Sequence, residues 1–502
     1  MIQSLRNFFR LLQVATAFVR HDAMFIFELV PKLKPFTAIV QRFVWRPSTA
    51  RPGQRLAAAL TELGPSFIKL GQTMATRADL IGADVAADLA TLQDRLPPFD
   101  GKIARRIIEA DLGAPISQLF AEFNDKPTAA ASIAQVHWAI TSDGADVAVK
   151  VLRPGIEAAL ARDLEFFFWG ARWLEWVQPA FRRYRPVDAV AMLEQWTKRE
   201  IDLRLEAAAA SEFARNCADD EGFRVPLVDW PRTGRRVVTF ERIHGLPTHN
   251  RDALMAAGHD PTVLLETAAR VFFNQVFRDG FFHGDMHPGN MLIERDSTIV
   301  ALDFGIMGRL DLPTRRNLAE VLIGFLAGDY DRVAEVFFQA GFVPAEQDQA
   351  AFAQACRAIG EPIVGLALKD ISLGRILGQV LTLAEGFDMR AQPQLLLLQK
   401  TMVVSEGVGR KLNPDVNMWQ LAQPLVEEWV AANLGPQAQL ARAVDQALYV
   451  TKTLPRLVEK LDNMANGGSV AQTQTHRGGW RPALGYIASG VILGWLLHYI
   501  LP

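Results

Sequence analysis

The sequence predicts an α+β fold of two lobes, and three short stretches of sequence carry the prediction. They are His283-Gly-Asp285-Met-His-Pro-Gly-Asn290, Asp303-Phe-Gly305, and the apolar run 146–152 that holds Lys150. An Asp on a short loop, an Asn five residues later and a second Asp beyond a hairpin can position a nucleophile and hold Mg²⁺ during phosphoryl transfer. The sequence therefore predicts a bilobal fold of the protein-kinase type.

The segment between these motifs predicts a β-hairpin. Residues 291–294 and 298–302 are short apolar runs on either side of a polar turn, which is typical of two paired strands. Such a hairpin would bring Asn290 and Asp303 side by side. The alternative is a polar loop beside a buried strand pair, in which Asp-Phe-Gly carries no function.

Lys150 lies within a strand-like run, where alternation lets its side chain face a cleft while the neighbouring valines face the core. A buried ammonium needs an anionic partner. The candidates Glu200, Asp202 and Glu206 cluster on a stretch predicted to be helical, residues 195–210. Alone, such a Lys would more often lie at a sheet edge with its charge in water. Ahead of a catalytic loop, a role in binding phosphate is favoured.

An alanine-rich loop occupies the place where a phosphate-covering loop is expected. The residues expected to contact the nucleotide there are Ala129, Ala130, Ala131, Ser132, Ile133, Ala134, Gln135 and Val136. Glycine is usual in such loops because it lets backbone N–H groups approach the anion, and alanine restricts that freedom. Ordinary kinase behaviour is therefore not expected, and the start of a helix is the alternative interpretation.

At this point the chain resembles the UbiB family of atypical kinases, the bacterial relatives of the mitochondrial coenzyme Q kinase-like proteins. The most specific shared stretch is Phe67-Ile-Lys69-Leu-Gly-Gln72, which is similar to the family's Lys-x-Gly-Gln signature and continues through residues 73–80 and 92–94. The alanine-rich loop and Glu200-Ile-Asp202, which is similar to a Glu-x-Asp motif, are further marks. The resemblance runs from about Gly53 to beyond Asp303.

The resemblance implies a helical N-terminal extension that folds over the active site. Lys69, with Gln72 in the same signature, would enter the cleft and pair with Glu200 or Asp202 in a regulatory role. It also implies the following roles: Glu206 pairs with Lys150, Asp285 lies in the catalytic loop, Asn290 and Asp303 ligate Mg²⁺, and ATP is the nucleotide. A strand at 235–240 leads to a hinge with Glu241 and Ile243, where the backbone would meet the adenine.

The implied function is that of a membrane-associated kinase or ATPase that supports ubiquinone biosynthesis. The family has also carried the name 2-polyprenylphenol 6-hydroxylase, but the sequence has neither a Gly-x-Gly-x-x-Gly after a strand nor a convincing iron triad. Two alternatives stay open. One is a small-molecule phosphotransferase, since similar loops occur in aminoglycoside and choline kinases. The other is a nucleotide-gated, lipid-binding scaffold.

Composition limits the choice further. The chain has 502 residues, a formal charge of −2 and two distant cysteines, Cys217 and Cys356. This balance argues against nucleic-acid binding, and the cysteines predict neither a disulfide framework nor a zinc site. The expected segments are a basic amphipathic segment (1–52), a helical extension (53–125), an N-lobe (126–245), a C-lobe (246–463), a linker (464–480) and a transmembrane segment (481–502).

The two ends favour contact with a membrane. Residues 1–51 contain eight Lys and Arg against Asp22 and Glu28, and Leu5, Phe8, Phe9 and Leu12 form an apolar helical stripe. Such a helix suits an anionic membrane surface, or alternatively packs on the kinase-like body.

Residues 483–501 are free of Lys, Arg, Asp and Glu and are long enough to span a bilayer; an interfacial or core helix is the alternative. Preceding arginines favour a cytoplasmic N-terminal side. We expect a bacterial inner-membrane protein with its catalytic body on the cytoplasmic side. The expected partners are membrane lipid, prenylated quinone precursors and ubiquinone-biosynthesis proteins. Gly490 and Gly494 leave a homodimer open.

Two apolar runs have two interpretations. The aromatic run 166–176 and the Leu-rich run 395–400, which ends in Lys400, favour buried helix core. Contact with a polyprenyl lipid is the alternative.

Overall fold

The structure is a computed structural model that describes residues 2–25, 49–75, 81–89, 92, 97–179, 182, 185–362, 372–389, 392–413 and 418–434. The described residues up to Asn433 belong to one compact unit. The predicted linker (464–480) and transmembrane segment (481–502) lie outside the described residues, as do positions 76–80 and 93–94 of the family signature. In the part of the chain that is described, no helix is long and apolar enough to cross a membrane.

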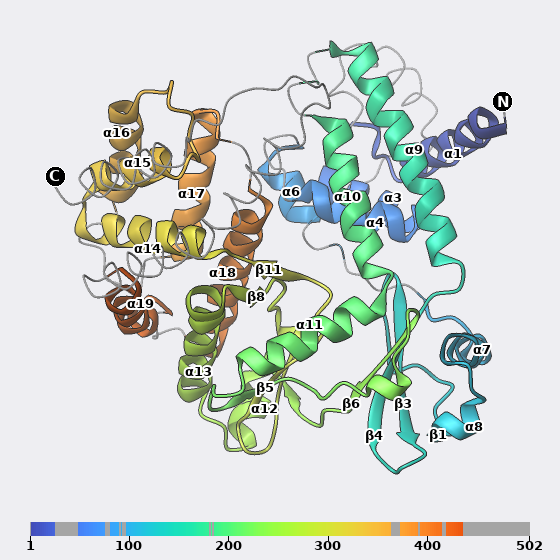
Figure 1. The fold of residues 1–502 in the computed structure, drawn as a ribbon. Coiled ribbons are helices and arrows are strands. Elements are labelled where there is room, and N and C mark those ends of the chain that lie inside the picture. Colours follow the sequence, from blue (N-terminus) through green and yellow to red (C-terminus); the bar gives the residue numbers. More distant parts are fainter. Residues whose placement is uncertain are drawn as a thin grey trace, which may run out of the picture. The chain divides into compact units, whose positions relative to one another are not determined.

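Helices dominate the N-terminal region (Figure 1). They are α1 (Ile2–Arg20), α3 (Pro52–Leu63), α4 (Pro65–Ala75), α6 (Ala83–Leu89), α7 (Gly101–Leu112) and the short α8 (Ile116–Leu119). Leu56, Leu60 and Phe67 from α3 and α4 pack with Phe166 and Phe167 in one apolar core. The predicted helical extension is therefore present, and its core is shared with a helix from the middle of the chain.

Helix α1 packs on this body through residues outside the predicted stripe. Val14 and Phe18 are buried in the same core as α3 and α4, whereas Phe9 and Leu12 are 59% and 47% exposed. The Arg10 guanidinium donates to both carboxylate oxygens of Asp163, at 2.8 and 3.0 Å. The helix thus docks by one face and leaves apolar side chains of its other face exposed.

The smaller lobe is an antiparallel sheet. Its strands β1 (Phe120–Phe123), β3 (Ala134–Thr141), β4 (Asp146–Leu152) and β6 (Val237–Glu241) lie side by side in that order, and β2 (Ala129–Ala130) pairs with β3. Along β4, Val149 and Val151 are fully buried, as expected for alternating side chains. The alanine-rich loop therefore begins as a strand, so the alternative of a helix start is wrong.

Between β4 and β6 lie the α-helices α9 (Ile156–Val177), α10 (Pro186–Glu200) and α11 (Leu203–Asn216). The predicted continuous helix over 195–210 is wrong. Helix α10 ends at Glu200, and the Asp202 side chain accepts a hydrogen bond from the Arg204 N–H and caps α11. An Asp cap starts a new helix because it satisfies an otherwise unpaired N–H group. The aromatic run lies on α9, with Phe166 and Phe167 buried and Trp176 76% exposed.

The larger lobe places the predicted hairpin beside helices. Strands β9 (Met291–Ile293) and β10 (Ile299–Ala301) pair antiparallel, with Ala301 opposite Met291, so the hairpin prediction is confirmed. Strands β5 (Phe223–Arg224) and β7 (Leu246–Pro247) flank them, and β8 (Phe281–His283) pairs with β11 (Met307–Arg309). The helices of this lobe that precede the hairpin are α12 (Arg251–Ala256) and α13 (Pro261–Phe273), and α13 continues into a π-helical turn at Asn274–Asp279.

After Gly305 the chain passes through β11 into α14 (Leu312–Ala327), whose N-cap is Asp311. The remaining helices are α15 (Tyr330–Gln339), α16 (Gln349–Gly360), α17 (Leu373–Gly386), α18 (Pro393–Leu412) and α19 (Met418–Leu434). On α18, Leu395 and Leu398 are each 2% exposed, so these two leucines of the Leu-rich run are core. Both cysteines are buried and unbridged.

Candidate active site

Lys150 joins the small lobe to α11 and to the Asp-Phe-Gly motif. Its Nζ lies 2.7 and 3.0 Å from the two carboxylate oxygens of Glu206 and 3.2 Å from Asp303 Oδ1. Glu206 lies in the first turn of α11, where the helix dipole favours a negative charge. Of the three acidic candidates, Glu206 is thus the residue that the structure brings to Lys150.

The charges of this group depend on one another. Burial opposes the charged form of Lys150, but the Asp303 and Glu206 carboxylates outweigh burial and raise the pKa of Lys150 above its ordinary value. Burial raises the pKa of Glu206, and Lys150 opposes that shift. The Lys150 ammonium lowers the pKa of Asp303 to about 2. Asp303 is therefore a carboxylate at any physiological pH, as a metal ligand must be.

The catalytic-loop motif begins with a buried histidine. His283 is fully buried, its Nε2 lies 3.1 Å from the Leu302 carbonyl oxygen, and its Nδ1 accepts from the Asp285 N–H at 3.1 Å. These contacts place the ring proton on Nε2, and burial lowers the pKa of His283. A neutral His283 therefore links the backbone of Asp285 to Leu302, the residue that precedes Asp303.

Asn290 completes this loop. Its Nδ2 donates to the Asp285 carbonyl oxygen at 3.1 Å, and its own carbonyl oxygen accepts from the Leu302 N–H at 2.8 Å. Because Nδ2 is used in this way, the side-chain oxygen of Asn290 is the atom left for a cation. The hairpin thus ties Asn290 to the residue that precedes Asp303.

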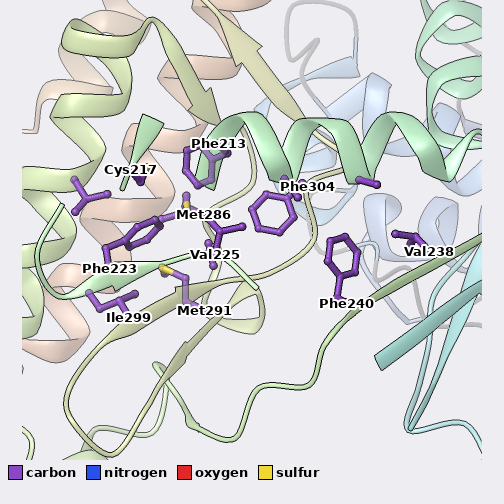
Figure 2. Packing of buried hydrophobic residues seen from close by; sticks show 14 of the residues in the cluster. Phe213, Cys217, Phe223, Val225, Val238, Phe240, Met286, Met291, Ile299 and Phe304 are labelled. Atoms are coloured by element: carbon purple, nitrogen blue, oxygen red, sulfur yellow. The ribbon is translucent and has the colours of Figure 1, made fainter. Parts of the chain in front are cut away.

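The Asp-Phe-Gly motif has a strained backbone and a buried ring. Asp303 has φ +60°, in the left-handed region that is costly for most residues, and its Oδ1 accepts from the Gly305 N–H at 3.3 Å. The Phe304 ring is 2% exposed, with its centroid 5.9 Å from Phe213, 6.2 Å from Phe240 and 5.7 Å from His283. In Figure 2 Phe304 lies in the buried cluster between Phe213 of α11 and Phe240 of β6. Packing of the ring therefore fixes where the Asp303 side chain can lie.

The donor set at Asn290 and Asp303 suits a hard cation. Mg²⁺ takes oxygen ligands and usually keeps water and phosphate oxygens beside one or two carboxylates. The Asp303 side chain is 51% exposed, which leaves room for those other ligands. Within the described part of the chain, no group of three His, Cys, Asp or Glu residues could hold a metal alone. These residues would fit Mg²⁺ that arrives with a nucleotide.

The alanine-rich loop is a tight turn held by a cation. Ala129 pairs with Val136 and Ala130 with Gln135, and the Ala131 N–H donates to the Ala134 carbonyl oxygen at 2.8 Å. The Ala131 carbonyl oxygen accepts two hydrogen bonds from the Arg153 guanidinium, and the Ile133 carbonyl oxygen accepts from the Arg153 N–H. Arg153 also donates to the Pro97 carbonyl oxygen at 2.8 Å, so it ties the loop to the N-terminal extension.

Two side chains of the predicted nucleotide-binding loop are buried. Ser132 is 1% exposed. The Gln135 side chain, also 1% exposed, accepts from the Phe99 N–H at 3.0 Å and donates to the Phe99 carbonyl oxygen at 3.2 Å. The Gln135 amide therefore holds the segment before α7, residues 97–100, which we call the strap. Any nucleotide contact from Gln135 would be made by its backbone.

The hinge is braced from the side of the larger lobe. The Glu241 N–H donates to the Leu227 carbonyl oxygen at 2.8 Å, and the Glu241 carboxylate accepts two hydrogen bonds from Arg224, at 2.9 Å each. Arg224 binds Glu294 of the hairpin in the same way, at 2.7 and 2.8 Å. Ile243 follows and is 8% exposed. Glu241 thus holds the hinge in place, and no pattern in the sequence indicated Arg224 as its partner.

The signature of the extension reaches α10. Lys69 of α4 lies 3.2 Å from Glu200 Oε1, and both side chains are 15% exposed. Asp202, the other predicted partner, instead binds the Arg204 guanidinium and caps α11. The Gln72 amide donates to the Leu92 carbonyl oxygen at 3.4 Å. The pair that the resemblance implied is formed with Glu200.

Asp285 has a neighbour that the sequence did not indicate. Asp285 Oδ1 lies 3.3 Å from Lys400 Nζ of α18, and Oδ2 lies 3.5 Å from His287 Nε2. The next residue of α18, Thr401, donates its hydroxyl to the Gly284 carbonyl oxygen at 3.0 Å. In the sequence, Lys400 is the last residue of an apolar run far from the motif, and only its charge at the end of that run was a signal.

The site combines a Lys–Glu pair between a sheet and a helix, a catalytic-loop Asp and Asn, and an Asp-Phe-Gly motif behind a hairpin. Together these define an atypical kinase-like protein. Residues 91–337 match the ABC1 atypical kinase-like domain, and residues 356–417 match the UbiB helical domain. These features imply nucleotide binding.

The chain belongs to the UbiB family. It is 41% identical to "Probable protein kinase UbiB" of Marinobacter nauticus over 93% of this chain and 87% of that one. It is 39% identical to the protein of the same name in Shewanella pealeana, over 94% and 87%. The solved complex of Rv3197 with erythromycin from Mycobacterium tuberculosis is similar at 25% identity and a TM-score of 0.45, over 72% of this chain and 93% of that one.

Proposed function

We propose that this protein is a membrane-associated, Mg²⁺-dependent ATPase or kinase that supports ubiquinone biosynthesis. One observation carries the proposal: Lys150 Nζ lies within 3.2 Å of both Glu206 and Asp303. This arrangement leaves a cation at the position where nucleotide phosphates bind and a carboxylate where Mg²⁺ would join them. The family name supports the ubiquinone pathway.

In this proposal the residues divide the work. Lys150 binds the α- and β-phosphates, and Glu206 orients it. The hinge backbone at Glu241 and Ile243 meets the adenine, and the alanine-rich loop covers the phosphates. Asn290 and Asp303 hold Mg²⁺, which neutralises charge on the phosphates. Asp285 orients the attacking water or hydroxyl group and accepts its proton.

In this proposal α4 lies over the cleft, as the resemblance to the family implies, and the largely buried pair of Lys69 and Glu200, at 3.2 Å, joins it to α10. A protein substrate would then have to displace α4. This supports water or a small lipid-derived hydroxyl group as the acceptor in preference to a protein side chain. Prenylated quinone precursors and proteins of the ubiquinone pathway are the partners that follow from the family name.

The proposed location is the cytoplasmic face of the bacterial inner membrane. The support is the apolar run at 483–501 in the sequence and the face of α1 that leaves Phe9 and Leu12 exposed. A helix with exposed apolar side chains can bury them in the surface of a lipid bilayer.

The test is Mg²⁺-dependent ADP release by the purified full chain, with and without anionic liposomes that carry a prenylated phenol. We expect turnover that rises with lipid and is lost in Asp303→Asn. Asp296→Asn, the same change at an exposed site in the same hairpin, is the matched control and should keep the wild-type rate. Equal rates in Asp303→Asn and wild type would refute the assignment.

A further inference from the structure

Helix α18, which belongs to the part of the chain that matches the UbiB helical domain, is fixed against the catalytic loop. Thr401 is 1% exposed, and its hydroxyl donates to the Gly284 carbonyl oxygen at 3.0 Å. A Cβ atom at Gly284 would lie 2.8 Å from Leu397 Cδ2, closer than side-chain carbons pack. Contacts from Leu397 and Thr401 on either side of Lys400 therefore set where the Lys400 backbone lies.

From this position Lys400 reaches Asp285. Its Nζ lies 3.3 Å from Asp285 Oδ1, and its side chain is 46% exposed. An ion pair that is so exposed adds little to stability. The stability of the fold therefore does not explain why a cation lies at this point of a Leu-rich helix.

The other basic side chains near the site make different contacts. Lys150 binds Glu206 and Asp303. His287 accepts the Gly289 N–H at Nδ1, and its Nε2 lies 3.5 Å from Asp285 Oδ2. Within the described residues, Lys400 is the only Lys or Arg at ion-pair distance from Asp285. It is thus the ammonium that lies beside the catalytic-loop carboxylate.

We propose that Lys400 is a catalytic residue that binds the terminal phosphoryl group of the nucleotide beside Asp285. The inference rests on the proposed nucleotide chemistry and adds a role for the helical domain. An ammonium carries three donors, so Nζ can keep its contact with Asp285 and donate to a phosphate oxygen as well.

Lys400 forms no covalent bond in the proposed chemical step. The oxygen of water or of an acceptor hydroxyl forms a bond to the terminal phosphorus, and its proton passes to the Asp285 carboxylate. The bond from that phosphorus to the bridging oxygen breaks, and its electron pair leaves with ADP. Lys400 keeps its protons and stabilises negative charge on the transferred group, an effect worth about 10²- to 10³-fold in kcat for a single well-placed donor.

The experiment compares Lys400→Gln with Lys411→Gln in the full chain. Lys411 is exposed in the last turn of the same helix and gives a matched control. Binding of ADP and of the imido analogue of ATP is measured by titration, and ADP release is measured alongside. Thermal unfolding of both variants checks that α18 stays folded.

We expect Lys400→Gln to weaken binding of the ATP analogue about tenfold, to change ADP binding less than twofold and to lower kcat about 10²-fold. Lys400→Arg should restore most of the preference for the ATP analogue, since it restores the cation. Lys411→Gln should match wild type in every measurement.

Two outcomes overturn the inference: equal weakening of ADP and ATP-analogue binding in Lys400→Gln, or no change in either. If the wild-type chain binds nucleotide without turning it over, the proposed activity fails. Selective loss of ATP-analogue binding would still support Lys400 as the residue that binds the terminal phosphate. The two ideas can therefore fail separately.

Discussion

The Lys150 ammonium lies 2.7 Å from the Glu206 carboxylate, with the two side chains 15% and 7% exposed. Strand β4 and helix α11 are thus joined by an ion pair that is largely shielded from water. Removal of one partner from such a pair leaves the other charge buried and uncompensated.

A double-mutant cycle tests this pair. We expect Lys150→Met to lower the free energy of unfolding by about 3 kcal/mol, because Glu206 is left without its cation. Lys150→Met combined with Glu206→Leu should recover much of that loss. Denaturant unfolding of the full chain gives the values, and the exposed pair Lys198 and Glu194 on α10 is the control, with a coupling of about 0.5 kcal/mol or less. Additive losses at Lys150 and Glu206 would contradict the coupling.

Phe304 should couple the core to catalysis. Phe304→Ala removes the ring that packs on Phe213 and Phe240, which should cost about 3–5 kcal/mol and release Asp303 from its fixed position. Phe337→Ala on α15, at a site that is also buried, should cost a similar amount of stability. At a temperature where both variants are folded, we expect ADP release to be lost only in Phe304→Ala. Equal rates would mean that the ring does not position Asp303.

The strap before α7 should loosen when Gln135 is changed. Gln135→Leu removes both hydrogen bonds to the Phe99 backbone and leaves those groups unpaired, at a cost of about 1–3 kcal/mol. The free energy of opening that hydrogen exchange gives for the Phe99 amide should fall by a comparable amount. Gln118→Leu on the surface of α8 should leave this free energy unchanged. Unaltered protection at Phe99 would show that the strap is held by other contacts.

Acid should destabilise the small lobe through His137. Its Nδ1 donates to the Asn124 carbonyl oxygen, its Nε2 accepts from the Gln135 amide, and burial lowers the pKa of His137. In the unfolded chain His137 takes up a proton near pH 6.5, whereas in the folded chain it does so only at lower pH. The contribution of neutral His137 to the free energy of unfolding is therefore complete above pH 6.5 and declines as pH falls toward the folded pKa.

The slope from one such histidine is at most about 1.4 kcal/mol per pH unit. His137→Gln should reduce the change in unfolding free energy per pH unit below pH 6.5. The contribution of buried His283 to that slope should remain. His244→Gln, at a site that is 68% exposed, serves as the comparison and should keep the full slope. An unchanged slope in His137→Gln would contradict this account.

Much of the fold followed from local patterns. The hairpin between Asn290 and Asp303 was predictable because alternating apolar residues and a polar turn act over a few residues. The strand that holds Lys150 was predictable for the same reason. The break between Glu200 and Leu203 was not predicted, because helix propensity is high on both sides and only the Asp202 cap marks the new start.

Other contacts could not be predicted because a side chain had two suitable uses. Gln135 lies in a loop expected to cover phosphate, but the fold gives its amide to Phe99. On α1, Phe9 and Leu12 belong to the predicted apolar stripe, but the residues buried against the body include Val14 and Phe18 of another face. Periodicity shows that a helix has an apolar face and does not show which partner covers it.

By itself, the sequence determined the kinase-like class, the catalytic-loop and Asp-Phe-Gly residues and the family, because these depend on residue types at short, fixed spacings. The tertiary structure decided which carboxylate Lys150 and Lys69 each take as partner. It also decided that Lys400 meets Asp285 from 115 residues away. Such pairs are set by how helices pack on the sheet and on the catalytic loop, and no local pattern encodes a contact between side chains that meet only after the chain has folded.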